Sequence, residues 1–189
     1  MRDYWVFGYA SLMWYPGFKY EEAHLADLQG GHRALCVWSK SYRGTQAKPG
    51  LVFGLDAGGT CRGMVFRVSQ KNFPVVRSYL RRREMTTFIY REAYRPVVLL
   101  DGSGRNVRAL TYVVNCDHPH YVGKLPCEYQ AHIIRTRRGK NGRNIDYFTN
   151  TIHHLRDLNI YDRNLERVCT HIGETRRRSW DNSHTLLKF

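Results

Sequence analysis

The order of strand-like and helix-like segments limits the folds open to this chain. Up to residue 115, apolar segments rich in β-branched and aromatic residues alternate with glycine-containing turns and a single helical segment. After Pro126, helical spacing of apolar residues prevails. Strands that come first and helices that cluster late are typical of an α+β protein. Glycines within the strand segments indicate curvature, so we expect a small curved or closed sheet.

Glycine-containing turns separate the expected strands. Residues 19–25 predict a short polar connection, and the paired glycines Gly30 and Gly31 predict a kink or bulge in the strand that contains them. Residues 56–60 predict the turn of a hairpin, and residues 101–104 predict a second one. The first expected strand ends at Gly8. The others cover residues 28–38, 51–55, 61–68, 86–90, 94–100 and 107–115.

Four helices are expected. Pro74 suits the first turn of a helix that ends near Glu84, and Asp162 is placed to cap the last, short helix. The expected helices cover residues 72–84, 126–138, 145–158 and 162–169, with a break at 139–144. A chain of 189 residues buries roughly 70% of its unfolded surface when folded. We expect one domain over residues 1–175 and a loosely held basic tail over 176–189.

The net charge is +14, from 30 Lys and Arg against 16 Asp and Glu. Basic residues cluster at 81–83, 135–143 and 176–178, but none of these clusters belongs to a known nucleic-acid-binding motif. A basic surface also favours a small anionic substrate. No apolar run reaches the roughly 20 residues of a membrane helix, and no signal-peptide pattern opens the chain. Five widely spaced cysteines without a C-x-x-C pair predict a reduced, cytoplasmic protein.

Side chains that bind metals or act as nucleophiles form no readable motif. Cys116, His118 and His120 alternate, but Pro119 between the histidines is typical of an ordinary turn, and zinc sites show better-paired ligands. No nucleophile elbow and no phosphate-binding glycine loop is present. We therefore expect neither a metal nor another cofactor.

The stretch over residues 6–14 is the first candidate for function. It begins as an apolar strand, breaks at Gly8 and presents the short polar turn Tyr9-Ala10-Ser11 before two more large apolar residues. A buried strand that ends in a tight loop is well placed to aim backbone N–H groups at a ligand. The same pattern is also typical of a simple turn, and the residues alone leave both interpretations open.

Glu84 is the second candidate. It lies at the expected C-terminus of a helix, where the helix dipole disfavours a carboxylate and raises its pKa, while the preceding arginines at 81–83 act in the opposite direction. A carboxylate in that position is a candidate general base. An exposed glutamate paired with an arginine fits the residues equally well.

A series of short blocks, taken together, resembles a known family. Residues 7–14, Phe-Gly-Tyr-Ala-Ser-Leu-Met-Trp, are similar to the F-G-Y-G-S-L-x-W opening of the ChaC family of γ-glutamylcyclotransferases. Further blocks follow in the family's order and extend the resemblance over residues 5–168. They are Gly31-His32-Arg33, Arg43-Gly44-Thr45, 48–52, 58–63, Leu80 with Arg83-Glu84, Tyr121-Val122-Gly123 and 142–147.

The resemblance implies a small mixed β-barrel surrounded by helices. It also implies release of 5-oxoproline from a γ-glutamyl compound, typically glutathione, with Cys-Gly as the other product and no cofactor. Glu84 matches the family's general acid/base, and Tyr121 matches a substrate-contacting tyrosine. From its loop position, we expect Arg43 to pair with a substrate carboxylate. The γ-glutamyl group is expected to lie against Tyr9, Ala10, Ser11 and Leu12.

Ala10 departs from the family, which usually has glycine there. If the position requires positive φ, alanine costs about 1–2 kcal/mol. If its backbone touches substrate, the methyl group narrows the pocket. The sequence therefore also allows the same fold to act on another γ-glutamyl amine. A non-catalytic nucleic-acid-binding protein, suggested by the +14 charge, is the remaining alternative.

Overall fold

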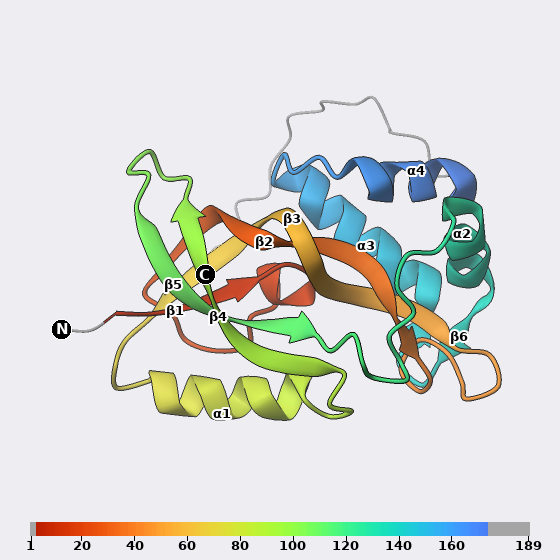
Figure 1. Ribbon diagram of the computed structural model, residues 1–189, viewed down its shortest axis with the longest axis horizontal. Helices are drawn as coiled ribbons and strands as arrows, with labels where there is room; N and C mark the ends of the chain where they lie inside the picture. Colours follow the sequence, from red (N-terminus) through yellow and green to blue (C-terminus); the bar gives the residue numbers. More distant parts are fainter. Residues whose placement is uncertain (1–2, 174–189) are drawn as a thin grey trace.

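Five strands close into a barrel in the computed structural model, which describes residues 3–173. Their order around the barrel is β1, β3, β2, β4, β5 (Figure 1). The β1–β5 pair is parallel and the other pairs are antiparallel, so the barrel is mixed, which confirms the expected α+β fold. The strands are β1 (Tyr4–Gly8), β2 (Glu22–Ser39), β3 (Gly50–Val68), β4 (Tyr90–Leu99) and β5 (Asn106–Val114).

One long strand, β3, replaces the hairpin expected over residues 51–68. Ala57 and Thr60 remain paired with β2, opposite Gly31 and Gln29. The intervening glycines at 58 and 59 take φ values of 85° and 75°, so they absorb an irregularity in register rather than reverse the chain. The glycines that predicted a turn are therefore a bulge. The predicted irregularity of β2 at its own glycines is confirmed at the same place.

The prediction of a polar connection over residues 19–25 is also wrong for residues 22–25. Strand β2 begins at Glu22, because Glu22 to Leu25 pair with Arg67 to Met64 of β3. Likewise, residues 86–88 are a bend rather than a strand, and β4 begins at Tyr90. The second predicted hairpin is confirmed as β4 and β5.

Helix α1 (Phe73–Glu84) packs on the outer face of β1 and β5. Its buried residues Val76 and Leu80 contact a cluster that includes Val6, Leu110 and Tyr112. The helix ends at Glu84, as the sequence predicts, and this places the Glu84 carboxylate at the edge of the barrel. In Figure 1, α1 lies on one side of the barrel and the later helices lie on the other.

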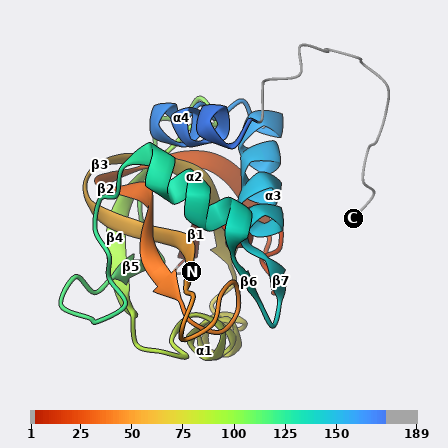
Figure 2. The ribbon, with the colours of Figure 1, turned by 90° about the vertical axis from the view of Figure 1, so that its right-hand side faces the viewer.

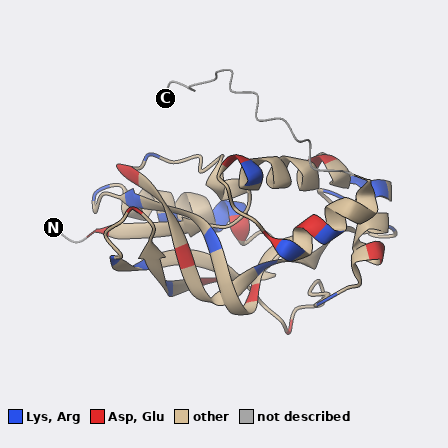
Figure 3. Ribbon diagram, turned by 90° about the horizontal axis from the view of Figure 1, so that it is seen from above, with Lys and Arg blue, Asp and Glu red and all other residues tan. Residues whose placement is uncertain are grey.

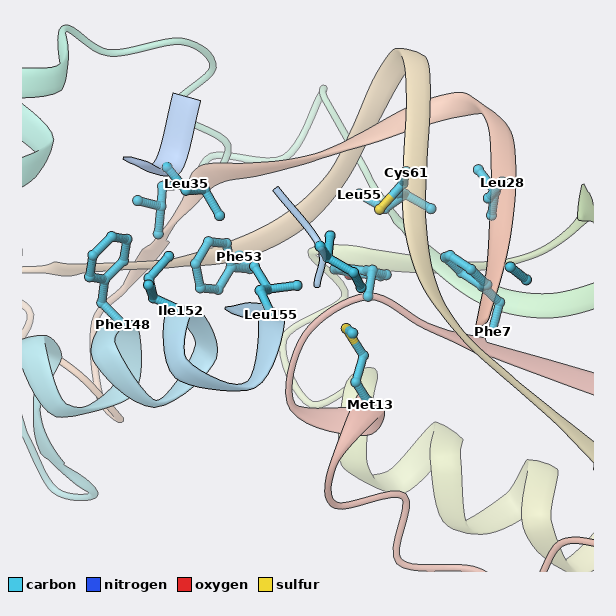
Figure 4. Close-up of a cluster of buried hydrophobic side chains, with 14 of the residues drawn as sticks. Phe7, Met13, Leu28, Leu35, Phe53, Leu55, Cys61, Phe148, Ile152 and Leu155 are labelled. Carbon is cyan, nitrogen blue, oxygen red and sulfur yellow. The ribbon is translucent and has the colours of Figure 1, made fainter. Parts of the chain in front are cut away.

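Three helices cover the side of the barrel opposite α1 (Figure 2): α2 (Cys127–Thr136), α3 (Asn144–Asp157) and α4 (Arg163–Ile172). Figure 4 shows Phe53 of β3 facing Phe148, Ile152 and Leu155 of α3. The rings of Phe53 and Phe148 stack at a centroid distance of 6.2 Å. The main apolar core therefore continues from the barrel interior into the interface with these helices.

Local hydrogen bonds fix the ends of the late helices. Asp162 accepts hydrogen bonds of 3.2 Å from the N–H groups of Asn164 and Leu165, which confirms it as the cap of α4. Buried Asn144, the first residue of α3, accepts from Leu51 N–H and donates to Leu51 O, both at 2.7 Å. A small ribbon, β6 (Arg138–Gly139) and β7 (Gly142–Arg143), occupies the predicted break before α3. The basic tail predicted over 176–189 lies outside the described residues.

Candidate active site

The chain after β1 folds into a single 3₁₀ turn, η1 (Ser11–Met13). The turn folds so tightly against Gly8 that a Cβ there would lie 2.8 Å from the Leu12 Cβ, which explains the glycine. Ala10 has φ of −138°, so the position does not require a left-handed backbone. Alanine at this position therefore does not incur the cost of about 1–2 kcal/mol that a positive φ would impose.

The first peptide N–H groups of this turn have no acceptor within it, as at the start of any helix. The turn closes when Met13 N–H donates to Ala10 O at 2.8 Å. Behind it, the buried Arg33 guanidinium donates from Nε to the Tyr9 carbonyl oxygen. Because C=O and N–H point in opposite directions in a trans peptide, this bond aims the Ala10 N–H away from Arg33.

Glu84 faces the turn from the end of α1. Its side chain is 20% exposed, and its Oε1 lies 3.2 Å from the Nε of Arg83. Burial raises the pKa of this carboxyl above its ordinary value of 4.5, and the positive charge of Arg83 acts in the opposite direction. The loss of solvent wins, so Glu84 is a carboxylate that takes up a proton more readily than an exposed one.

Arg83 joins α1 to the turn. Its guanidinium donates to the Ser11 hydroxyl at 2.9 Å, to the Tyr15 carbonyl oxygen at 2.7 Å and to the Tyr79 hydroxyl at 3.1 Å. One planar fork thereby contacts Glu84, the η1 turn and the chain that follows it. Together with the packing of Leu12 against Leu80 of α1, this side chain holds Glu84 beside the turn.

A cavity of about 60 Å³ lies between the turn and Glu84. The structure therefore brings together all four residues predicted to hold the γ-glutamyl group and the predicted acid/base. Four aromatic residues that sequence reasoning missed complete the lining. The lining residues are Tyr9, Ala10, Ser11, Leu12, Phe53, Glu84, Tyr90, Tyr112 and Tyr147.

The missed tyrosines are neutral donors at the cavity wall. Tyr90 donates to Phe53 O at 2.7 Å, and the Tyr147 hydroxyl accepts from Phe53 N–H at 3.2 Å, which leaves its own proton for another acceptor. Burial raises the pKa of Tyr147 to about 12 and that of Tyr9 well above its ordinary value. The buried Tyr112 hydroxyl has no hydrogen-bond partner among residues 3–173. In the sequence, Tyr90 and Tyr112 have only the strand patterns around them as a signal, whereas Tyr147 closes the family block at 142–147.

An outer groove of about 310 Å³ adjoins the inner cavity and shares Ser11, Glu84, Tyr90 and Tyr147 with it. Its other walls include residues 37–43, residues 86, 87 and 89, and His120. Two larger depressions, of about 490 and 540 Å³, lie elsewhere on the molecule, and Glu84 lines neither. The convergence of a half-buried carboxylate, phenols and backbone N–H groups favours the smaller site.

Arg43 and Tyr121, the remaining predicted site residues, lie outside the inner cavity. Arg43 lines the outer groove, donates from Nη1 to Asn141 O at 2.6 Å and lies 5.2 Å above the Tyr147 ring centroid. Tyr121 lines neither the inner cavity nor the groove. Its hydroxyl donates to the Asp56 carboxylate at 2.9 Å. The structure thus brings Arg43 to the edge of the site but not Tyr121.

Within residues 3–173, no group of three or more His, Cys, Asp and Glu side chains is arranged to hold a metal ion. The Cys116 thiol approaches Asp56 at 3.8 Å, and His118 meets His120 edge to face. No helix of the described chain has the length and apolar character required to cross a bilayer.

Known proteins match this chain over most of its length. A family model described as ChaC-like protein matches residues 4–175. The glutathione-specific gamma-glutamylcyclotransferase of Escherichia coli K12 is 32% identical over 161 residues, which covers 85% of this chain and 69% of that protein. The enzyme of the same name from Schizosaccharomyces pombe is 33% identical over 173 residues, with 82% and 83% covered.

A solved structure shares the fold. The crystal structure of a gamma-glutamyl cyclotransferase specific to glutathione from yeast has a TM-score of 0.81 and 21% identity, covering 95% of this chain and 100% of that chain. Because the family model spans nearly all of the described residues, this chain belongs to the ChaC-like family.

Proposed function

We propose that this chain is a γ-glutamylcyclotransferase that cleaves glutathione into 5-oxoproline and Cys-Gly. The observation that carries the proposal is the half-buried carboxylate of Glu84 in one cavity with the turn after β1. Membership of the ChaC-like family supports the same reaction, since relatives matched over most of the chain are named glutathione-specific gamma-glutamylcyclotransferases.

The substrate supplies its own nucleophile. Its α-amine attacks the γ-carbonyl carbon, a new N–C bond closes the five-membered lactam, and the amide bond to cysteine breaks. The protein therefore has to fold the γ-glutamyl chain into the attack geometry, and fixing such a conformer contributes several kcal/mol. The aromatic walls from Tyr90, Tyr112 and Tyr147 restrict the chain in this way.

Glu84 moves the proton. As a carboxylate it takes a proton from the α-ammonium, and as an acid it then delivers that proton to the departing amine of cysteine. The second proton that the α-nitrogen loses as the lactam forms passes to the freed carboxylate and from there to the amine of Cys-Gly. A raised pKa suits both halves of this cycle, because it strengthens the base and leaves the acid form accessible. One group therefore serves both transfers in turn.

The N–H groups at the start of η1 stabilise the oxyanion of the tetrahedral intermediate. They are held in place from behind by Arg33 and from the side by Arg83, so they do not reorganise when charge develops. The phenol of Tyr147, whose proton is not used by Phe53, adds a neutral donor at the same wall.

The two parts of the site divide the substrate between them. The γ-glutamyl group occupies the inner cavity and the departing Cys-Gly lies in the outer groove. Arg43, which covers the Tyr147 ring at the edge between the two, is placed to pair with the α-carboxylate of the γ-glutamyl group. Tyr121 is not part of this arrangement, because its hydroxyl is held by Asp56. The net charge of +14 attracts a substrate that is net negative.

A reducing compartment such as the cytoplasm suits this enzyme. All five cysteines lie within residues 3–173, and no disulfide bond joins them there. Nucleic acid remains the less favoured partner, because Figure 3 shows basic segments on several elements with acidic segments among them.

The experiment is a product analysis. Purified protein is incubated with glutathione, and 5-oxoproline, glutamate and Cys-Gly are quantified. We expect 5-oxoproline and Cys-Gly in equal amounts and no glutamate, and we expect α-N-acetylglutathione to be inert because its amine is blocked. Glutamate release would contradict the cyclisation. Other γ-glutamyl amines tested in parallel decide the alternative substrates, and a preference for one of them would overturn glutathione as the substrate.

A further inference from the structure

Lys40 lies in the outer groove without a counter-charge. It follows directly after β2, is half-buried and lines the groove together with Trp38 and His120. Within residues 3–173 its ammonium group takes part in no ion pair and no side-chain hydrogen bond. An ammonium group without a counter-charge at the wall of a groove is free to attract a ligand that brings a negative charge.

The other cations of the groove are already engaged. Arg83 contacts Glu84 and the η1 turn, and Arg43 donates to the Asn141 carbonyl oxygen while it covers the Tyr147 ring. His120 does not add a positive charge that competes for an anion, because burial and the nearby charge of Lys40 both lower its pKa. Lys40 is thus the groove cation most available to an incoming anion.

We propose that Lys40 binds the terminal carboxylate of the departing peptide, a subsite that rests on the proposed function. Two residues of extended chain span roughly 7 Å, so the terminal carboxylate of the departing dipeptide lies about that far from the bond that breaks. Glu84 and Lys40 both line this groove, and no other acidic side chain of residues 3–173 lines it. The leaving peptide thereby brings the negative charge that the groove lacks.

This subsite makes the chain selective for γ-glutamyl peptides with a free carboxylate. A substrate whose leaving group is an ester or an uncharged amine keeps the inner contacts but loses the attraction to Lys40. A hydrogen bond between the ammonium group and the charged carboxylate is worth about one order of magnitude in affinity. We therefore expect glutathione to be favoured over its glycyl ethyl ester by about tenfold in kcat/KM.

The test compares both substrates with wild type, Lys40→Met and Lys71→Met. Lys71 is an exposed lysine before α1. It is separated from Glu84 by the 12 residues of that helix, or about 18 Å, so its substitution removes the same charge away from the groove. Release of 5-oxoproline gives kcat/KM for each pair. We expect Lys40→Met to lower kcat/KM for glutathione to the level of the ester, with the ester unchanged, and Lys71→Met to keep the wild-type preference.

Equal kcat/KM values for both substrates in the wild type, or an unchanged preference in Lys40→Met, would overturn the subsite. Calorimetric binding of the same two compounds to Glu84→Gln gives an independent reading. If no 5-oxoproline forms at all, the proposed reaction fails, yet tighter binding of glutathione than of the ester, abolished in Glu84→Gln/Lys40→Met, would still support the subsite. Equal affinities would refute it.

Discussion

The Arg83 guanidinium donates a 2.9 Å hydrogen bond to the Ser11 hydroxyl, and this contact ties the end of α1 to the turn that follows β1. The same side chain lies 3.2 Å from the Glu84 carboxylate. Residues 72 positions apart in the chain are thereby held on one side of the inner cavity. Two properties of the site, its geometry and the charge state of Glu84, depend on this one residue.

Arg83→Met and Arg83→Lys separate those two properties. Without the positive charge, the pKa of Glu84 rises further, so the acid limb of the pH profile of kcat/KM moves to higher pH in Arg83→Met. Lysine keeps the charge but not the planar fork, so Arg83→Lys keeps the limb near its wild-type position while kcat falls about tenfold. A limb that does not move in Arg83→Met would show that another group controls the profile.

Tyr112→Phe tests the unpartnered phenol of the inner cavity. Removing a buried hydroxyl that has no partner does not destabilise the apo protein, and it raises the unfolding free energy by up to about 1 kcal/mol. Tyr90→Phe is the matched control. It breaks the 2.7 Å bond to Phe53 O and costs about 1 kcal/mol. Urea unfolding measures both, and a larger loss for Tyr112→Phe than for Tyr90→Phe would contradict the assignment.

Ala10→Gly tests whether the departure from the usual glycine sets substrate choice. The φ of −138° is open to alanine, so glycine lowers stability by about 0.4–1 kcal/mol through the entropy of the unfolded chain. Ala10 lines the inner cavity, which holds the γ-glutamyl group common to all substrates, so rates over a panel of γ-glutamyl amines change together. A changed order of preference would place the leaving group against this residue.

Several elements could be predicted from local patterns, because their signals are local. Helix α1 ends at Glu84 and the cap of α4 is Asp162, both as the sequence predicts. The glycines at 58 and 59 misled, because a bulge and a turn require the same positive φ, and only the pairing with β2 distinguishes them. Long-range pairing of that kind has no signature in a single strand.

The site was predictable in part. The turn and Glu84 were identified separately, and the resemblance to a family joined them. The role of Arg83 as the link requires a contact between distant segments and was not foreseen. Tyr90 and Tyr112 lie in strands, where tyrosine is a common strand former, so nothing local separates a cavity phenol from an ordinary one.

The stability of the protein depends on pH through Glu84. Because the folded-state pKa is raised above its ordinary value of 4.5, the folded state holds the proton more tightly than the unfolded state. Stability therefore falls as pH rises from below 4.5 through the folded pKa, and Glu84→Gln avoids this loss. Urea unfolding between pH 4 and 8 should show that the unfolding free energy of Glu84→Gln, relative to that of the wild type, rises with pH. A constant difference would contradict the raised pKa.

The most direct test of the account is the turnover of Glu84→Gln with glutathione, measured beside its binding affinity. Glutamine keeps the size of the side chain but accepts no proton from the α-ammonium. We predict that kcat for 5-oxoproline release falls by at least about 100-fold, while the Kd for glutathione stays within about threefold of the wild-type value. A variant that binds glutathione and retains wild-type kcat would show that Glu84 does not transfer the proton.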